Sequence, residues 1–378
     1  MRGEAVKRVL FIGNDVTYFL THRLPMALGA REAGYEVHVA APRADGVERI
    51  VAQGFQYHHI QLSRWGGHPM REFRSLCSIY RVLREVKPDL VHQVTIKPVI
   101  YGGLMARLAG RPAIVSAVSG LGFVFLQRGL LGGIVRNAAR LAYKLAFAHR
   151  RIRVIFQNPD DRAEFIARGL VNAKKTVLIK GSGVNVRIFA ASPEPQGAVT
   201  VVFPSRMLWD KGLREFVDAA GKLRSEGITA RFALVGNEEP GNPASASTSQ
   251  LQQWHDSGVV EWWGYRGDMS AVFAGAHLVC LPSYREGVPK ALIEAAACGR
   301  AIVTTDVPGC REIVRDGWNG LLAPARDANA LADALRSLIA DAEKRAEFGE
   351  RGRELAVAEF SVERVVQETL EVYRDLLQ

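Results

Sequence analysis

Cysteine is scarce in this chain of 378 residues, which contains only Cys77, Cys280, Cys298 and Cys310. No two of them share the Cys-x-x-Cys spacing of a zinc site and no cluster of histidines lies near them, so neither a zinc site nor a framework of disulfides is indicated. We therefore expect buried, reduced thiols. No apolar run reaches the roughly 18 residues of a membrane span, and residues 1–7 lack the apolar core of a signal peptide. These absences predict a cytoplasmic location.

Two ligand-binding motifs are also missing. No Asp-x-Asp occurs, so the carboxylate pair that often holds a divalent ion on a nucleotide diphosphate is absent, and we expect no bound metal. The turn Gly13-Asn14-Asp15 does not continue into Gly-x-Gly-x-x-Gly, which disfavours a nicotinamide dinucleotide. We accordingly expect no cofactor.

Acidic residues are unevenly distributed. Residues 1–185 hold 28 basic and 12 acidic side chains, a balance of +16, whereas residues 186–378 hold 21 and 27, a balance of −6. Ten Lys or Arg and no acid lie between Asp89 and Asp160. Within this stretch, residues 128–153 interleave cations with leucines, as a basic amphipathic helix does. Such a helix either lies on an anionic membrane or packs on a sheet with a solvated basic face.

The net charge of +10 raises binding to nucleic acid as one alternative. No aromatic-basic reading motif accompanies the charge, and the negative balance of the second half argues against it. We therefore expect no nucleic-acid partner.

Short apolar runs rich in β-branched residues alternate with helical patterns and predict buried parallel strands. In the first half these runs are 8–13, 36–41, 90–95, 113–119, 153–158 and 176–180; in the second they are 200–204, 231–236, 259–264, 278–282 and 301–305. They predict an α/β chain with two doubly wound, Rossmann-like domains facing a cleft, over residues 1–183 and 184–360, and a closing helix over 361–378. Residues 239–248, rich in Pro, Asn, Ala and Ser, are expected to form a mobile surface loop.

The segment from Glu286 to Glu294 follows a predicted strand and opens a helix. Gly287 allows close approach of the backbone to a ligand, and Pro289 suits the first helical position, so free N–H groups there suit a diphosphate. The two glutamates are up to roughly 12 Å apart if all is helical, which is too far for an acid-base pair. This spacing suits two carboxylates that bind different parts of a nucleotide sugar. The alternative is a pair of solvated surface glutamates.

A second segment, residues 206–212, also follows a predicted strand and opens a helix. Arg206 and Lys211 are five positions apart and could clamp a diphosphate without metal. The missing Asp-x-Asp favours this clamp. The alternative is an exposed arginine beside an ordinary lysine at a helix start.

Together these segments resemble glycosyltransferase family 4, retaining nucleotide-sugar transferases of the GT-B fold, over essentially the whole chain. The matching parts are the Gly13 turn, residues 181–185, Arg206 with Lys211-Gly212, residues 234–236, Gly264-Tyr265, Pro282-Ser283 and residues 286–294. A narrower resemblance is to bacterial N-acetylgalactosaminyltransferases that extend a sugar on undecaprenyl diphosphate, in residues 119–122, 208–212 and 127–153.

The resemblance implies residue roles. Catalytic roles fall to Glu286, Arg206 and Lys211. Donor contacts fall to Gly13, Gly236, Tyr265, Arg266, Gly287, Val288, Pro289, Lys290 and Glu294. On the acceptor side we place Ser119 together with His22, Arg23 and Lys97, and for these last three an ordinary surface or cap residue is the alternative. Many family members carry a His where this chain has Ser119, which leaves a His-assisted mechanism without its His.

The sequence thus predicts a retaining hexosyltransferase at the inner face of the cell membrane. It would move a hexosamine, N-acetylgalactosamine from its UDP donor, onto a polyprenyl-diphosphate-linked saccharide, in bacterial surface polysaccharide or protein glycan assembly. The alternative is a nucleotide-sugar epimerase of the same architecture, which would convert the donor without any acceptor.

Overall fold

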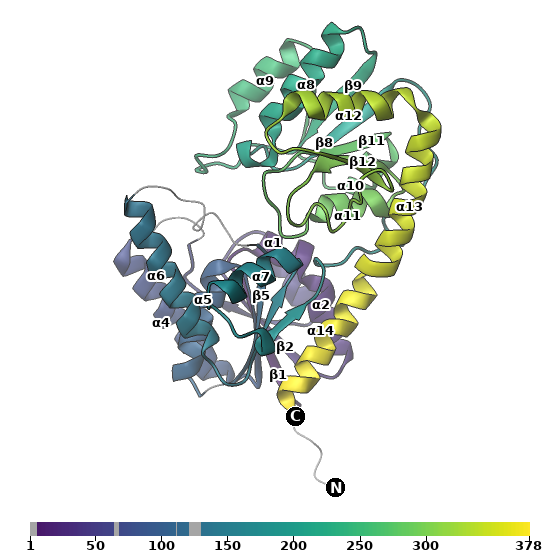
Figure 1. Cartoon of the computed structure of the whole chain (residues 1–378). Coiled ribbons are helices and arrows are strands. Elements are labelled where there is room, and N and C mark those ends of the chain that lie inside the picture. Colours follow the sequence, from purple (N-terminus) through teal and green to yellow (C-terminus); the bar gives the residue numbers. More distant parts are fainter. Residues whose placement is uncertain (1–5, 64–67, 111, 121–129) are drawn as a thin grey trace. The chain divides into compact units, whose positions relative to one another are not determined.

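The computed structural model describes residues 6–63, 68–110, 112–120 and 130–378 (Figure 1). The chain divides into two compact units. Unit 1 comprises residues 1–182 with Glu363–Gln378, and unit 2 comprises Gly183–Val362. The C-terminal segment therefore returns to the first unit. Its helix α14 spans Val362–Leu377, and the residue before it, Ser361, is the C-cap of the preceding helix.

Unit 1 is built on a seven-stranded parallel sheet of order β3-β2-β1-β4-β5-β6-β7. Its strands are β1 (Arg8–Ile12), β2 (Glu36–Ala41), β3 (Gln56–His59), β4 (Leu90–Val94), β5 (Ala113–Val118), β6 (Ile152–Phe156) and β7 (Thr176–Leu178). Strand β3 was not among the predicted strands. It is a short edge strand with no fully buried residue and so carries no apolar run.

Helices cover both faces of this sheet, as crossover connections between parallel strands require. One face packs against α1 (Val16–His22), α2 (Leu24–Glu32), α3 (Val47–Ala52) and α14. The other packs against α4 (Pro69–Val86), α5 (Ile96–Leu108), α6 (Leu130–Phe147) and α7 (Pro159–Ala167). Each face has its own apolar core.

Unit 2 repeats the architecture with a six-stranded parallel sheet of order β10-β9-β8-β11-β12-β13. Its strands are β8 (Val199–Pro204), β9 (Ala230–Val235), β10 (Glu261–Gly264), β11 (Leu278–Leu281), β12 (Ala301–Thr305) and β13 (Gly320–Ala323). Its helices are α8 (Leu213–Ser225), α9 (Thr248–Asp256), α10 (Met269–Ala274), α11 (Lys290–Ala297), α12 (Ala328–Ala340) and α13 (Ala342–Phe360). Two doubly wound sheets confirm the predicted fold class, although β13, another short edge strand, was missed.

Three of the four cysteines are buried in unit 2, as expected. Burial raises the pKa of the Cys298 thiol to about 11 and that of Cys310 to about 12, so both are protonated and inert at neutral pH. The expectation is wrong for Cys77, which is exposed on α4. Among the described residues, the helices are all too short or too polar to cross a bilayer.

Candidate active site in unit 2

The site in unit 2 is assembled by the strand order of its sheet. Strands β8 and β11 are parallel neighbours, so their carboxyl ends lie at the same edge, where ligands bind in such folds. The turn after β8 and the loop after β11 are therefore adjacent. A backbone hydrogen bond joins them directly, from the Tyr284 N–H to the Asp210 carbonyl at 2.9 Å.

Gly212 allows these two loops to touch. Its φ is +75°, and a Cβ atom there would lie 2.1 Å from the carbonyl oxygen of Pro282. Gly309, after β12, has φ of +84° and would place a Cβ 2.3 Å from the Gly287 oxygen. Only glycine fits either position, so both contacts hold the loop after β11 close to its neighbours.

Lys211 and Glu286 meet at this junction. The Lys211 Nζ donates to Glu286 Oε1 at 2.5 Å, and the Ser283 hydroxyl donates to the same oxygen at 2.7 Å. The two charged side chains are 16% and 12% exposed, so the pair is largely shielded yet still open to a ligand. A fixed ammonium beside a fixed carboxylate suits a substrate that carries both a phosphate and sugar hydroxyls.

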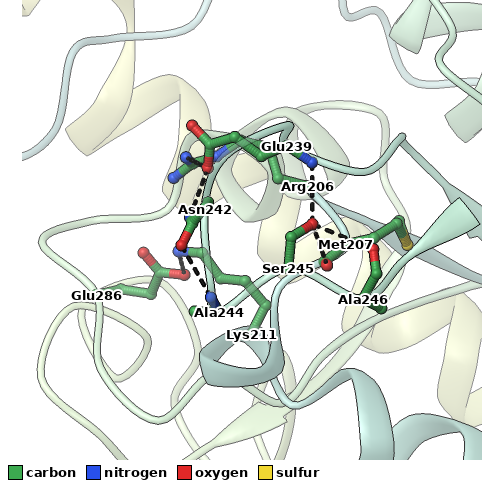
Figure 2. Close-up of polar contacts among 9 residues, drawn as sticks. All are labelled: Arg206, Met207, Lys211, Glu239, Asn242, Ala244, Ser245, Ala246 and Glu286. Atoms are coloured by element: carbon green, nitrogen blue, oxygen red, sulfur yellow. Dashed lines mark hydrogen bonds and ion pairs between the residues drawn. The ribbon is translucent and has the colours of Figure 1, made fainter. Parts of the chain in front are cut away.

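Arg206 faces a different carboxylate, on the loop that follows β9 (Figure 2). Its Nη1 lies 2.5 Å from Glu239 Oε2, and the Asn242 amide donates to the same oxygen at 2.9 Å. The Glu239 N–H donates in turn to Ser245 Oγ. In the described structure, then, each of the two predicted cations has its own carboxylate, and sequence reasoning missed Glu239.

The loop that carries Glu239 is bound to the Arg206 turn. The Trp209 N–H donates to the Ala244 carbonyl and the Ala246 N–H to the Met207 carbonyl, both at 2.8 Å. Ala246 is fully buried. The expectation of a mobile surface loop over 239–248 is therefore wrong for residues 244–246, which these bonds and this burial fix. Serine and asparagine here satisfy backbone groups, which composition alone does not reveal.

Glu294 lies on α11, the helix that follows the Glu286 loop. Burial raises its pKa, and Lys290, one turn earlier on the same helix, opposes the shift through an ion pair. Pro289 is the N-cap rather than the first helical residue, a correction of one position. In the described chain the N-cap Pro289 offers no side-chain acceptor to the N–H groups that begin α11, and N–H groups at a helix start attract an anion.

The remaining donor candidates of unit 2 lie at the same sheet edge. Gly236 follows β9 with φ of +148°, and a Cβ there would lie 1.9 Å from the Ser205 oxygen, in the turn that carries Arg206. Its N–H donates to the Gly264 carbonyl, which brings the end of β10 alongside. Tyr265 and Arg266 follow directly and are exposed.

The candidates in unit 1 follow its own strands. The Gly13 N–H donates to the Ala40 carbonyl, which fixes the turn after β1. His22 Nδ1 is 3.2 Å from Ser182 Oγ, and the Lys97 Nζ donates to Glu72 at 2.8 Å. Arg23 is buried rather than exposed.

Ser119 lies just after β5 and is half-buried. Leu121, Gly122 and the first residues of the basic stretch, 127–129, lie outside the described residues.

Comparison with known proteins identifies the family. Residues 8–158 match the family described as glycosyl transferase 4-like, and residues 198–341 match glycosyl transferases group 1. The N-acetyl-alpha-D-glucosaminyl L-malate synthase of Bacillus anthracis is 30% identical, over 92% of this chain and 91% of its own. The chain belongs to the group 1, family 4-like glycosyltransferases.

Two further likenesses span nearly the full length of this glycosyltransferase. The N,N'-diacetylbacillosaminyl-diphospho-undecaprenol alpha-1,3-N-acetylgalactosaminyltransferase of Campylobacter jejuni is 27% identical, over 97% of this chain and 98% of its own. The crystal structure of Anabaena HepE, in complex with UDP and glucose, superposes with a TM-score of 0.78 at 19% identity, over 97% of this chain and 99% of that one. The predicted family and GT-B fold are confirmed.

Proposed function

We propose that this glycosyltransferase moves N-acetylgalactosamine from UDP-N-acetylgalactosamine onto a polyprenyl-diphosphate-linked saccharide, with retention of configuration. The observation that carries the proposal is the Lys211–Glu286 pair beside the uncapped start of α11. The Campylobacter jejuni relative supports the sugar and the acceptor, and the UDP in the HepE structure supports the donor.

The proposed chemistry follows from these groups. As the bond between the sugar C1 and the diphosphate oxygen breaks, negative charge gathers on the leaving phosphate, where Lys211 and the N–H groups of α11 stabilise it. Glu286 accepts from hydroxyls of the transferred sugar, and Glu294 from those of the ribose. The acceptor hydroxyl attacks C1 from the face that the diphosphate leaves, and its proton passes to the leaving phosphate oxygen.

Arg206 joins this site by releasing the Glu239 carboxylate and binding the donor diphosphate. Its guanidinium is about half exposed while the Glu239 carboxylate is largely buried, so the arginine is the partner that can turn toward a ligand. A diphosphate carries more charge than a carboxylate and accepts two parallel hydrogen bonds from one guanidinium. We therefore expect the donor to replace Glu239 as the partner of Arg206.

A lipid-linked acceptor places the reaction at a membrane surface. Helix α6 presents cations and exposed leucines in its described part, residues 137–147, and all its described charged side chains are basic. We include in the proposal a peripheral contact between α6 and an anionic leaflet at the inner face of the cell membrane.

Product analysis with purified protein tests the function. A panel of UDP-sugars is incubated with EDTA and a short polyprenyl-diphosphate saccharide, with and without this acceptor. We expect UDP release that depends on the acceptor, with one preferred donor and an α-linked product. Conversion of the donor without acceptor would instead support the epimerase, and an inverted product would refute retention.

Glu294 gives a pH prediction. Because burial raises its pKa, the carboxylate that would accept from the ribose is protonated at a higher pH than an ordinary glutamate. We expect kcat/KM for the donor to fall as the pH falls through this raised pKa. Glu294→Gln should remove that acid limb and lower kcat/KM at neutral pH.

The contribution of Glu294 to the stability of the fold should change with pH in the opposite direction to kcat/KM. A folded-state pKa above the unfolded value contributes stability at low pH that is lost as the pH rises through it, so the buried carboxylate is unfavourable at neutral pH. Glu294→Gln should therefore keep or raise the melting temperature at pH 7. Glu343→Gln, at an exposed carboxylate of the same unit, is the control. An unchanged pH profile in Glu294→Gln would contradict the donor role.

A further inference from the structure

An open surface cavity of about 350 Å³ lies against α6 in unit 1, and none of its lining residues is a donor or acceptor candidate named above. Its lining comprises Asn137, Arg140, Leu141 and Lys144 of α6, with Arg168 from the end of α7. The four α6 positions are spaced three and four apart and so share one face of the helix. All the charged side chains of this lining are cations.

The cations of this cavity are incompletely neutralised. Arg168 pairs with Glu164 on its own helix. Arg140 makes only a long contact from Nη1 to Asn137, at 3.5 Å, and its buried Nε has no partner in the part of the chain that the structure describes. A buried guanidinium N–H without an acceptor is costly, so the cavity favours an oxygen-rich anion. A phosphate group has that chemistry.

Apolar side chains adjoin these cations. Leu141 lines the cavity and is 59% exposed, and Leu145, one turn further along α6, is 45% exposed. Leu108 is exposed at the end of α5, where Arg107 donates to the Leu145 carbonyl at 2.8 Å. A free phosphate ion would leave these leucines in water. A phosphate joined to acyl chains would bury them.

We propose that this cavity binds the phosphodiester headgroup of an anionic phospholipid, with Leu141 and Leu145 entering the acyl boundary. The inference rests on the proposed membrane contact and gives it a specific site. The cavity volume is in the range of small-ligand sites, roughly 300–1,000 Å³. A headgroup held there seats unit 1 on the leaflet that carries a polyprenyl-linked acceptor.

Vesicle flotation of the full chain tests the cationic part. The vesicles are phosphatidylcholine with or without about one third phosphatidylglycerol. Each cation near the surface contributes about fivefold in affinity, so Arg140→Gln with Lys144→Gln should weaken binding to the anionic vesicles about 30-fold. The control is Arg43→Gln with Lys174→Gln, at two exposed cations of unit 1. Equal losses in the two double variants would overturn the site, because only net charge would then matter.

Two further measurements distinguish a phospholipid headgroup from a free phosphate ion as the occupant of the cavity. Leu141→Ser should weaken vesicle binding about tenfold and leave any weak binding of inorganic phosphate unchanged. If inorganic phosphate binds as tightly as the vesicles and displaces them, a free ion is the occupant and the proposal fails.

The last arm separates this site from the transferase activity. Transfer to a short-chain acceptor without vesicles should be unchanged in Arg140→Gln with Lys144→Gln. Vesicle binding that persists in a protein with no transferase activity would refute the proposed function alone.

Discussion

Replacing Lys211 with alanine should lower kcat/KM for sugar transfer by about 10²- to 10³-fold, the usual effect of removing a group that stabilises developing charge. The ammonium is held by Glu286 in a shielded position, so little reorganisation is needed when the leaving diphosphate gains charge. Most of the loss should appear in kcat, because the interaction strengthens as the bond breaks. Steady-state kinetics with the preferred UDP-sugar measure both parameters.

Lys222→Ala is the matched control for this prediction. Lys222 also lies in unit 2, on α8, and its Nζ donates to Asn329 on the exposed surface. Its kinetics should not change. Lys211→Arg should recover part of the lost kcat, since it retains the charge but alters the geometry. A Lys211→Ala enzyme with wild-type kcat/KM would exclude Lys211 from the reaction.

Lys211 and Glu286 could each be predicted from the sequence as site residues, but the contact between them could not. Each lies after an apolar run, and this signal is strong because strands buried on both faces contain almost no polar residues. Their contact depends on β8 and β11 being neighbours in the sheet, although β9 and β10 lie between them in the chain. Strand order is a long-range property that local periodicity does not encode.

Glu239 escaped prediction for a related reason. It lies in a stretch of prolines, asparagines and serines whose composition suggests an unconstrained loop. Glu239 is held by hydrogen bonds with Ser245 and Asn242, and its carboxylate pairs with Arg206. Such networks depend on side-chain direction, which no spacing rule supplies.

The backbone contact at Gly212 gives the largest expected effect on stability. In Gly212→Ala, the left-handed φ costs about 1–2 kcal/mol and the clash of the new Cβ with the Pro282 carbonyl adds about 1–3 kcal/mol. We expect the melting temperature of unit 2 to fall by about 10 °C. Activity should fall as well, because separating the two loops would move Lys211 away from Glu286.

Gly227, just beyond the other end of α8, separates the clash from the φ penalty. Its φ is +82°, close to that of Gly212, yet a Cβ there would have no atom within 4 Å. Gly227→Ala therefore carries only the conformational cost, and its melting temperature should fall by about 3 °C with unchanged kinetics. Calorimetry and kinetics on the two variants isolate the contact between the loops. Equal melting temperatures would mean that the Gly212 turn does not approach Pro282, and the placement of Lys211 beside Glu286 would lose its structural basis.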